Sequence, residues 1–493
     1  MQTVSAGFTA ATQATMRHPV SKLEISWDGT TWTDESERMV RHSGQLQLNA
    51  PGDDLIPPGS VGATIIELWN GDGRYSWKRT DGPLYAYIGS DAGLAGKRVR
   101  LWQGFMVSGA PEYVCIFTGV IYTWQDDTVV DTITLSLRDM GFAYLQDKAS
   151  TAMFTNIRVD EWIQHLATLA GISSVNLETS LFRLPYAWLD DESILEEIWR
   201  AAQADGGRAY FDQLGILRFE NAAHWLTSPH DTVQWSFTES AYQSPASRFN
   251  PDDLASRVIV EMQGRVPAKE AVVYTLDTLR VAKPGETITF ECRLTQPAAI
   301  IWTPQAEKDY QVVSPGGMDM NGDVTVSVTK YAQRVQVQLT NNHATMPAQL
   351  IFFQLRGIPL VGGPTQEVIK ETASPPADLE RTRSVRANQY LQTHAQADAL
   401  ASLLRDRHQR LMPVWELRGV RGVPQLELGD RVSFVDSQAI TGTREGYVIG
   451  IRWTYDGYFS QDLMILDAEN LFPYTDYFVI GQTALGANGR AWY

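Results

Sequence analysis

The chain has 493 residues, of which 44% are hydrophobic and 10% aromatic, and its formal net charge is −16 at pH 7. This length predicts three or four domains, and the apolar content excludes a mainly disordered chain. The negative charge argues against a nucleic-acid-binding surface, because affinity for DNA comes mainly from Lys and Arg side chains that neutralise phosphates. No stretch approaches the roughly 18 apolar residues of a membrane helix, so no stable membrane insertion is expected.

Residues 1–15 are small and polar, without a basic leader or an apolar centre. We therefore expect no signal peptide here, and we predict a flexible or partner-docked arm in a protein made inside a cell. The two cysteines, Cys115 and Cys292, lie in apolar strand-like runs, which favours buried free thiols over a disulfide or a metal site.

Alternating apolar residues predict a β-barrel domain over residues 1–150. A hairpin over 20–33 turns at Asp28-Gly29, and further strands are expected at 45–48 and 63–68. Asn70 and Asp72 in the loop that follows could be calcium ligands, but no bidentate Glu stands at the expected distance, so a plain loop is favoured.

Two stretches near opposite ends of the chain resemble each other. Each opens with a Gly-x-Arg-Val turn into an alternating strand, continues with a strand broken by a single Gly, and closes with a third apolar-rich strand. The segments of the first copy are 96–102, 115–124 and 132–137, and those of the second copy are 429–435, 446–453 and 461–466. The interpretation that we favour is a duplicated small β-barrel, and the alternative is that any two β-meanders rich in Gly and Val look alike. The second barrel is expected over residues 414–470.

Helical spacing of apolar residues predicts an α/β middle domain over 151–262, completed by 364–413. Helices are expected over 160–170, with Asp160 as cap, over 192–204 and over 385–411, and a hairpin is expected over 208–219. A polar linker is expected over 367–378. The buried stripe of the last helix should be Leu391, Ala395, Ala399, Leu400, Leu403, Leu404 and Leu411. Trp162 and Trp199 are interpreted as core residues rather than as a sugar-stacking platform.

Residues 263–363 carry no helical pattern and offer strands separated by turn signals, which predicts an inserted β-sandwich, carbohydrate-binding-like or immunoglobulin-like. The expected strands are 271–275, 286–294, 299–302, 323–329, 334–340 and 349–357. Asp319, Asn321 and Asp323 could bind a metal ion, although a plain loop is the favoured reading. The tail, 471–493, ends in Trp492-Tyr493 and is either a docking tag or an unstructured end.

No catalytic signature is present: the sequence lacks His-Glu-x-x-His, Gly-x-Ser-x-Gly, a P-loop and a dinucleotide-binding glycine motif. We therefore assign no catalytic residue, no cofactor-binding residue, no metal ligand and no cofactor. His165, His394 and His408 lie on predicted helices, where exposed or hydrogen-bonded histidines are expected. Carboxylates are plentiful, but a glycosidase pair is defined by its separation in space, so cell-wall hydrolysis stays open only as a remote alternative.

Three segments together resemble the baseplate or tail-tip hub proteins of bacterial viruses and related injection machines. The first runs from Asp72-Gly73-Arg74-Tyr75-Ser76 through Gly96-Lys97-Arg98-Val99 to Phe117-Thr118-Gly119. The second is the helix and hairpin over 194–219. The third joins the helix over 395–404 to Leu428-Gly429-Asp430-Arg431-Val432 and Val448-Ile449-Gly450-Ile451. The resemblance covers roughly 60–225 and 385–467, and the inserted sandwich departs from the family's minimal pattern.

The resemblance implies a non-enzymatic homotrimer at the tail tip of a virion, assembled in the host cytoplasm. Its implied partners are distal tail or tail-tube ring proteins, the C-terminus of a tape-measure protein, and a tail-fibre or central-fibre protein, with a function in host attachment and genome ejection. Three chains with two barrels each would offer six equivalent contacts to a sixfold tube, and an acidic lumen would let DNA pass without specific binding. The alternative is an adhesin whose sandwich binds host-surface glycans, with Trp302 and Tyr310 as stacking candidates.

Overall fold

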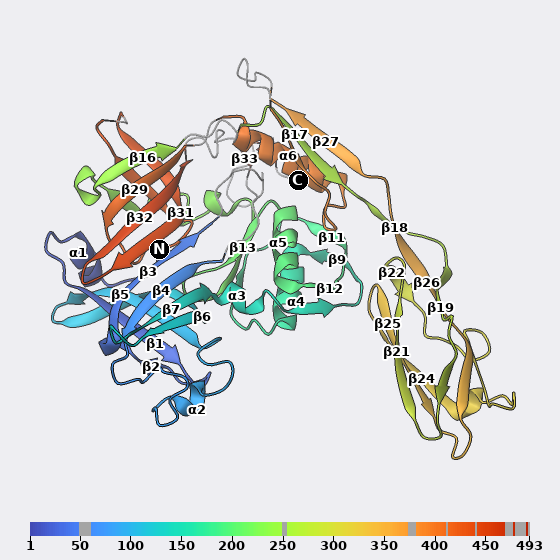
Figure 1. Ribbon diagram of the computed structural model, residues 1–493. Coiled ribbons are helices and arrows are strands. Elements are labelled where there is room, and N and C mark those ends of the chain that lie inside the picture. Colours follow the sequence, from blue (N-terminus) through green and yellow to red (C-terminus); the bar gives the residue numbers. More distant parts are fainter. Residues whose placement is uncertain are drawn as a thin grey trace.

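The computed structural model describes residues 1–48, 61–248, 254–372, 381–410, 413–438 and 441–468, and the backbone of 477–478 and 490–491. The chain is α+β and mainly β, as the sequence predicted. A large sheet, a helix-containing central region and an elongated sandwich follow one another across the molecule (Figure 1). Among the described residues, no helix is long and apolar enough to cross a bilayer. The expectation for Trp492-Tyr493 falls outside the described residues.

The large sheet contains thirteen strands drawn from both ends of the chain and from two central segments. Its strands are β1 (Pro19–Ser26), β2 (Thr33–Asp34), β3 (Met39–Gln47), β4 (Ala63–Trp69), β5 (Arg98–Val107), β6 (Ala110–Asp127), β7 (Thr132–Asp139), β15 (Trp235–Phe237), β16 (Ser244–Arg248), β29 (Val414–Arg421), β30 (Arg431–Val435), β31 (Thr443–Tyr455) and β32 (Phe459–Asp467). The order is β16-β29-β32-β31-β3-β4-β7-β6-β5-β1-β2, and β30 pairs with β31 and β15.

The two expected barrels are therefore two halves of one continuous sheet. Strand β3 pairs with β4 on one side and with β31 of the C-terminal half on the other. Pairings among the described strands do not close either half into a barrel of its own. The physical reason is length: β31 extends well beyond the short β30, and β3 covers the edge that this leaves.

The N-terminal arm is ordered and docks on its own chain. Helix α1 (Ala6–Gln13) packs on β5, with Phe8 fully buried and its ring 5.4 Å from that of Phe105 in edge-to-face contact. The backbone N–H of Gln2 donates to the carbonyl of Gln425 at 2.9 Å. The arm is thus neither flexible nor docked on a partner as predicted, because α1 places an apolar residue over the sheet of its own chain. Helix α2 (Tyr85–Ile88) lies in the loop region between β4 and β5.

The central region holds helices α3 (Met140–Tyr144), α4 (Val159–Leu169), α5 (Ile194–Ala204) and α6 (His394–His408). Its strands are β8 (Lys148–Ser150), β9 (Phe154–Arg158), β10 (Val175–Leu177), β11 (Arg183–Ala187), β12 (Asp190–Ser193), β13 (Arg208–Phe211), β14 (Leu217–Glu220), β17 (Arg257–Met262), β27 (Gln366–Glu371) and β28 (Thr382–Val385). The first two predicted helices and the hairpin β13–β14 are confirmed. Short 3-10 turns occur at Ser36–Arg38, His224–Leu226, Glu239–Ala241 and Asn321–Asp323.

Three details of the sequence prediction for this region are wrong. The cap of α4 is Arg158, because the Asp160 carboxylate is turned to Ser180, whose hydroxyl donates to it at 2.7 Å. The linker expected from residue 367 begins as strand β27, antiparallel to β17. The last helix starts only at His394, because Thr393 caps it by accepting a hydrogen bond from the N–H of Gln396 at 3.2 Å, and Ala395 is exposed rather than buried.

The inserted sandwich is confirmed as two facing sheets. One contains β18 (Arg265–Pro267), β19 (Ala271–Thr275), β20 (Arg280–Ala282), β22 (Ala298–Ile301), β23 (Tyr310–Val313) and the long β26 (Ala348–Gly362), and the other contains β21 (Thr287–Arg293), β24 (Val324–Lys330) and β25 (Arg334–Asn341). Cys292 is buried here and Cys115 is buried in the large sheet, both as free thiols, as predicted. Burial raises the pKa of Cys115 to about 11 and that of Cys292 to about 12.

Candidate functional site

The two repeats match hydrogen bond by hydrogen bond at their opening turns. In the first, the N–H of Gly96 donates to the carbonyl of Ile121 at 2.9 Å, and the N–H of Ile121 donates back to the residue after the glycine at 3.0 Å. In the second, Gly429 donates to Val448 at 2.7 Å, and Val448 donates back at 2.9 Å. Both glycines have positive φ, +76° and +87°, which an L side chain rarely adopts. The shared Gly-x-Arg-Val motif is thus a shared backbone geometry.

The second and third strands of the repeats also share their register. Gly119 of β6 lies opposite Asp139 of β7, and Gly446 of β31 lies opposite Asp467 of β32. In both pairs the register then shifts three residues after the glycine, so each long strand carries a β-bulge at the same place. Such agreement in register and bulge position favours a true duplication over a chance likeness of two meanders.

The correspondence extends beyond the three strands seen in the sequence. The N-terminal half has the order β3-β4-β7-β6-β5-β1, and the C-terminal half has β16-β29-β32-β31-β30-β15. The halves differ at the outer strand, because β1 runs antiparallel to β5 whereas β15 runs parallel to β30. Sequence reasoning missed β15 and β16, which are short, and Pro245 and the serines of β16 obscure any alternation.

The junction between the halves is tightly filled. Gly44 of β3 lies opposite Trp453 of β31, and a Cβ on that glycine would come within 2.4 Å of the indole. The ring of His42 stacks on that of Tyr455 at 5.1 Å. Desolvation lowers the pKa of His42 to about 3, so this histidine is neutral at physiological pH. Close packing of aromatic side chains therefore holds β3 on β31.

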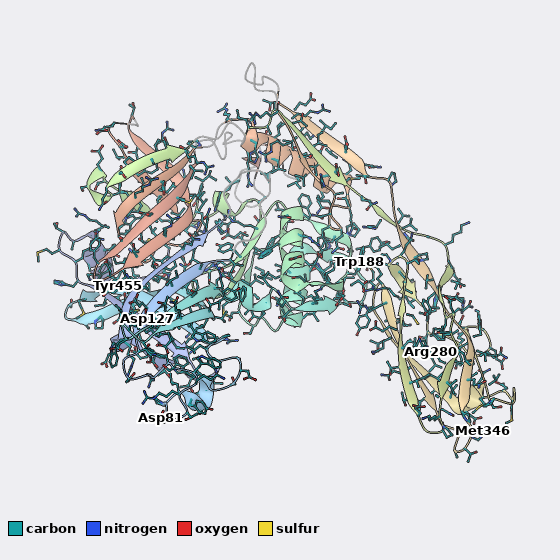
Figure 2. All side chains as sticks on the ribbon, in the orientation of Figure 1. Asp81, Asp127, Trp188, Arg280, Met346 and Tyr455 are labelled. Atoms are coloured by element: carbon teal, nitrogen blue, oxygen red, sulfur yellow. The ribbon has the colours of Figure 1, made fainter. Side chains whose placement is uncertain are left out.

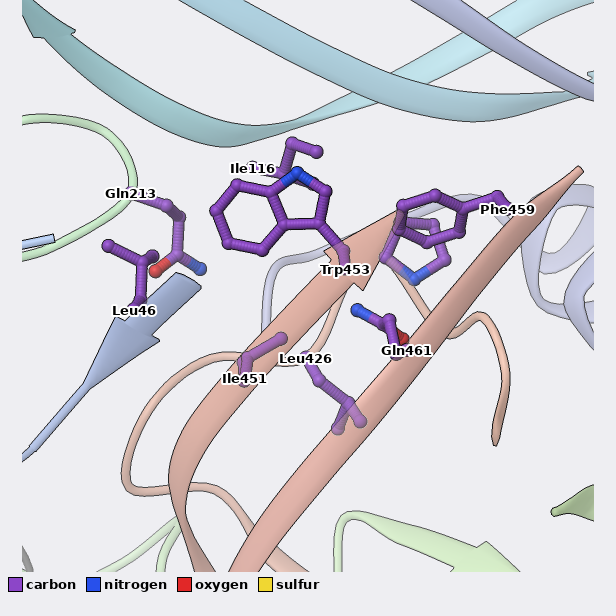
Figure 3. A pocket seen from close by; sticks show the side chains of 9 residues that line it. Leu46, Ile116, Gln213, Leu426, Ile451, Trp453, Phe459 and Gln461 are labelled. Atoms are coloured by element: carbon purple, nitrogen blue, oxygen red, sulfur yellow. The ribbon is translucent and has the colours of Figure 1, made fainter. Parts of the chain in front are cut away.

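A small cavity of about 10 Å³ lies beside this junction (Figure 3). Its lining comes from both halves and from the β13–β14 turn, and consists of Leu46, Ile116, Gln213, Pro424, Leu426, Ile451, Trp453, Phe459 and Gln461. Small-molecule sites usually occupy roughly 300–1,000 Å³. The cavity is below that range, so its lining residues are better explained as the packing of one half against the other.

A buried polar cluster joins the two sequence segments of the central region. The indole N–H of Trp162 on α4 donates to the Tyr390 hydroxyl at 3.1 Å, and that hydroxyl donates to Glu197 on α5 at 2.6 Å. Arg200 pairs with the same carboxylate. Desolvation, followed by the charge of Glu197, raises the pKa of Tyr390 well above its ordinary value. The cluster ties the chain after the sandwich to helices formed before it.

Among the residues weighed as metal ligands, Asn70, Asp72 and Asp319 have other partners. The guanidinium of Arg38 donates to the two oxygens of Asp72 at 2.9 and 2.7 Å, and Asn70 donates to Asp126 at 2.9 Å. In the sandwich, Asp319 accepts from the backbone N–H of Asn321 at 3.0 Å as part of a loop. Within the described residues, no group of three or more His, Cys, Asp and Glu side chains is arranged to hold a metal ion.

The aromatic and histidine candidates are placed as follows. Tyr310 is 8% exposed and packs in the sandwich core, so its ring is not available for stacking on a sugar. Trp302 is half-buried beneath the Arg356 guanidinium at 5.9 Å. His165 packs against aromatic rings, His394 is exposed and His408 is buried. Trp162 is a core residue, and Trp199 packs partly buried against the same core, as predicted.

No family model matches the chain, and no curated protein matches it either. Among solved structures, it matches a tail protein from Neisseria meningitidis MC58 with a TM-score of 0.50 and 10% identity, over 92% of this chain and 98% of that one. It also matches the 43 kDa tail protein of prophage MuSo2 from Shewanella oneidensis, with a TM-score of 0.48 and 13% identity, over 92% and 99% of the two chains. A prophage tail protein, gp18, from Listeria monocytogenes EGD-e follows at 0.41 and 7%, over 90% and 94%.

The first of these matches spans nearly all of both chains. Because the two sequences are only 10% identical, the match establishes a common fold and nothing more specific. The predicted resemblance to tail proteins is thereby confirmed at the level of the fold.

Proposed function

We propose that this chain is a structural hub protein of a bacteriophage tail, three copies of which form a ring that closes the tail tube. The observation that carries the proposal is the duplicated half-sheet, found in a chain with the fold of a tail protein. Three chains with two equivalent halves present six similar surfaces, which a ring of six tube subunits requires. The ring would join distal tail or tube proteins and the tape-measure C-terminus to a fibre or receptor-binding protein.

The charge of the chain supports a passage for DNA without specific binding. A net charge of −16 repels phosphates, so a lumen lined by this chain would let a genome pass without retaining it. This part of the proposal predicts that purified protein does not shift duplex DNA in an electrophoretic assay at low salt, where electrostatic binding is strongest. A clear shift that disappears at high salt would contradict it.

The decisive experiment is the mass of the purified full chain by light scattering, alone and mixed with the tail-tube protein of the same particle, followed by imaging of that particle. A trimer that seats on the tube ring at the tail tip supports the proposal. A chain that stays monomeric at all concentrations and ignores the tube protein would refute it. Clearing of purified peptidoglycan by the protein would instead favour the hydrolase alternative. We do not propose glycan binding by the sandwich, because Tyr310 is packed in its core.

A further inference from the structure

One contact between strands, that of β3 with β31, has no counterpart between the corresponding described strands of the other half. Within the chain, β3 of the N-terminal half lies along the second part of β31 of the C-terminal half. In the N-terminal half, the strand that corresponds to β31 is β6. Strand β5 pairs with β6 only as far as Val120. Beyond that point, the described strands pair with β6 only on its β7 side. The edge of β6 from Thr123 to Asp127 thus corresponds to the edge that β3 covers on β31.

The strand that corresponds to β3 also has a free edge. β16 occupies the place of β3 in the C-terminal half, and it stands at the end of the sheet, paired among the described strands only with β29. Ser247 and Arg248 of β16 are exposed, as are Thr123, Gln125 and Asp126 of β6. Exposed strand edges present unpaired N–H and C=O groups, which pair readily with another chain.

We propose that β16 of one copy of this chain adds, antiparallel, to the edge Gln125–Asp127 of β6 in the next copy, so that the contact between chains repeats the β3–β31 contact within each chain. The inference rests on the proposed ring and specifies how its subunits join. A contact of this kind uses two different surfaces, so it propagates head to tail and closes when the rotation per chain allows it.

The internal repeat also specifies the register of this contact. Following the paired residues across two strands from Gln45 leads to the residue that precedes Asp139, and doing so from Arg248 leads to the residue that precedes Asp467. Gln45 and Arg248 therefore occupy equivalent positions in the two halves. Arg452 and Gln125 are equivalent, because each lies six residues after the paired glycine. Since Gln45 lies opposite Arg452 in the chain, Arg248 of one copy should lie opposite Gln125 of the next.

The charges and the backbone suit this register. Along an antiparallel strand, successive residues direct their backbone N–H and C=O groups to opposite neighbouring strands. Counting from the hydrogen-bonded pair Asp467 and Pro413, the backbone groups of Arg248 point to β29 and those of Ser247 point to the open edge. Arg248 would then lie diagonal to Asp127 on the same face, a separation that a long side chain spans. Pro245 is the next residue of β16 whose backbone faces the open edge, and its missing N–H is tolerated in an edge strand.

Disulfide trapping tests the register directly. In antiparallel pairs without mutual hydrogen bonds, the Cα atoms lie about 4.5 Å apart, within the range that a disulfide spans. The variant carrying both Arg248→Cys and Gln125→Cys should therefore form disulfide-linked dimers and trimers under mild oxidation, seen on a non-reducing denaturing gel. The native thiols are buried and should not compete.

Two controls make the result specific. Mixing the two single variants should yield dimers and nothing larger, because each chain then carries one new thiol. Moving one thiol by a single residue, with Ser247→Cys and Gln125→Cys, turns that side chain to the other face and should abolish the crosslink. Folding of each variant is checked by its thermal unfolding curve.

The outcomes separate this proposal from the proposed function. A ladder that stops at three chains supports the junction and the ring together. A ladder that continues past three supports the junction and contradicts the closed ring. A trimer by light scattering that gives no crosslink overturns the junction and leaves the hub proposal standing, whereas a monomer without crosslinks overturns both.

Discussion

Gly119 and Gly446 occupy equivalent positions in the two repeats, and at both an added Cβ would meet the backbone of the neighbouring strand. A Cβ on Gly119 would lie 2.0 Å from the carbonyl oxygen of Arg138, and a Cβ on Gly446 would lie 2.5 Å from that of Leu466. Both obstacles are backbone atoms of the neighbouring strand, which cannot turn aside as the end of a side chain can. The single Gly in each middle strand therefore permits close approach of the backbones.

We expect Gly119→Ala and Gly446→Ala to destabilise the protein by similar amounts, about 1–3 kcal/mol each, because both overpack an equivalent strand pair. Urea unfolding monitored by Trp fluorescence measures the change in midpoint. The matched control is Gly322→Ala in the sandwich, where an added Cβ meets nothing within 4 Å and φ is ordinary. A near-neutral effect at one repeat only would show that the two positions are not equivalent.

Asp205, at the C-terminus of α5, is 1% exposed and accepts hydrogen bonds from the backbone N–H groups of Leu181 and Phe182, each at 3.0 Å. Desolvation outweighs these bonds and raises its pKa to about 8. Because the folded pKa lies above the unfolded value, the folded state binds the proton more tightly. This contribution to stability is complete at low pH and is lost as pH rises towards 8.

We therefore expect Asp205→Asn to reduce the pH dependence of stability. Between pH 5 and pH 7, wild type should lose about 3 kcal/mol of unfolding free energy that the variant does not lose, since one proton is released over two pH units. The measurement is the difference between the two proteins in urea unfolding at each pH, which cancels the other titrating groups. Equal slopes would mean that Asp205 has an ordinary pKa.

At the scale of elements, the central region depends on a contact between segments far apart in sequence. Tyr390 precedes α6 and is fully buried between Trp162 of α4 and Glu197 of α5. Its hydroxyl accepts one hydrogen bond and donates another, so removing it leaves a buried indole N–H without its acceptor and a buried carboxylate short of one donor. This one group therefore links three elements.

We expect Tyr390→Phe to cost about 1–3 kcal/mol, the penalty for leaving buried polar groups unsatisfied. Amide hydrogen exchange should quicken in α4 and α5 but not in the sandwich, which has a separate core. Tyr87→Phe, at a side chain that is 46% exposed, is the control and should be neutral. Uniform quickening of exchange across the chain would argue against a local role for the contact.

At the scale of the whole molecule, the sandwich is attached through two neighbouring strands. The chain leaves the central region through β17 and returns through β27, with Met262 opposite Gln366. The N–H of Gly363 donates to the carbonyl of Gly264 at 2.8 Å, so the ends of the insertion are adjacent. Figure 2 shows Trp188 where the central region faces the sandwich, and Met346 at the sandwich's far end. Arg334 also pairs with Asp190 at 2.8 Å across this boundary.

We expect a variant in which residues 265–362 are replaced by two glycines to fold and to assemble as the full chain does. The reason is that the insertion's ends already lie within hydrogen-bond distance and that its core is separate from the others. Circular dichroism and light scattering on the deletion variant and the full chain provide the measurement. Loss of assembly in a folded deletion variant would place part of the assembly surface on the sandwich.

The sequence by itself determined what is local in this protein. Alternation and turn residues predicted six of the sandwich strands and the two repeats, and helical spacing predicted α4 and α5, because these patterns reflect burial of one face of a single element. The short sandwich strands β18, β20 and β23 were missed. The tertiary structure decided the pairing of β3 with β31, the strand β16, the late start of α6 and the docking of α1. Those features depend on which distant edges and faces are left uncovered once the rest of the chain has folded, and no window of neighbouring residues contains that information.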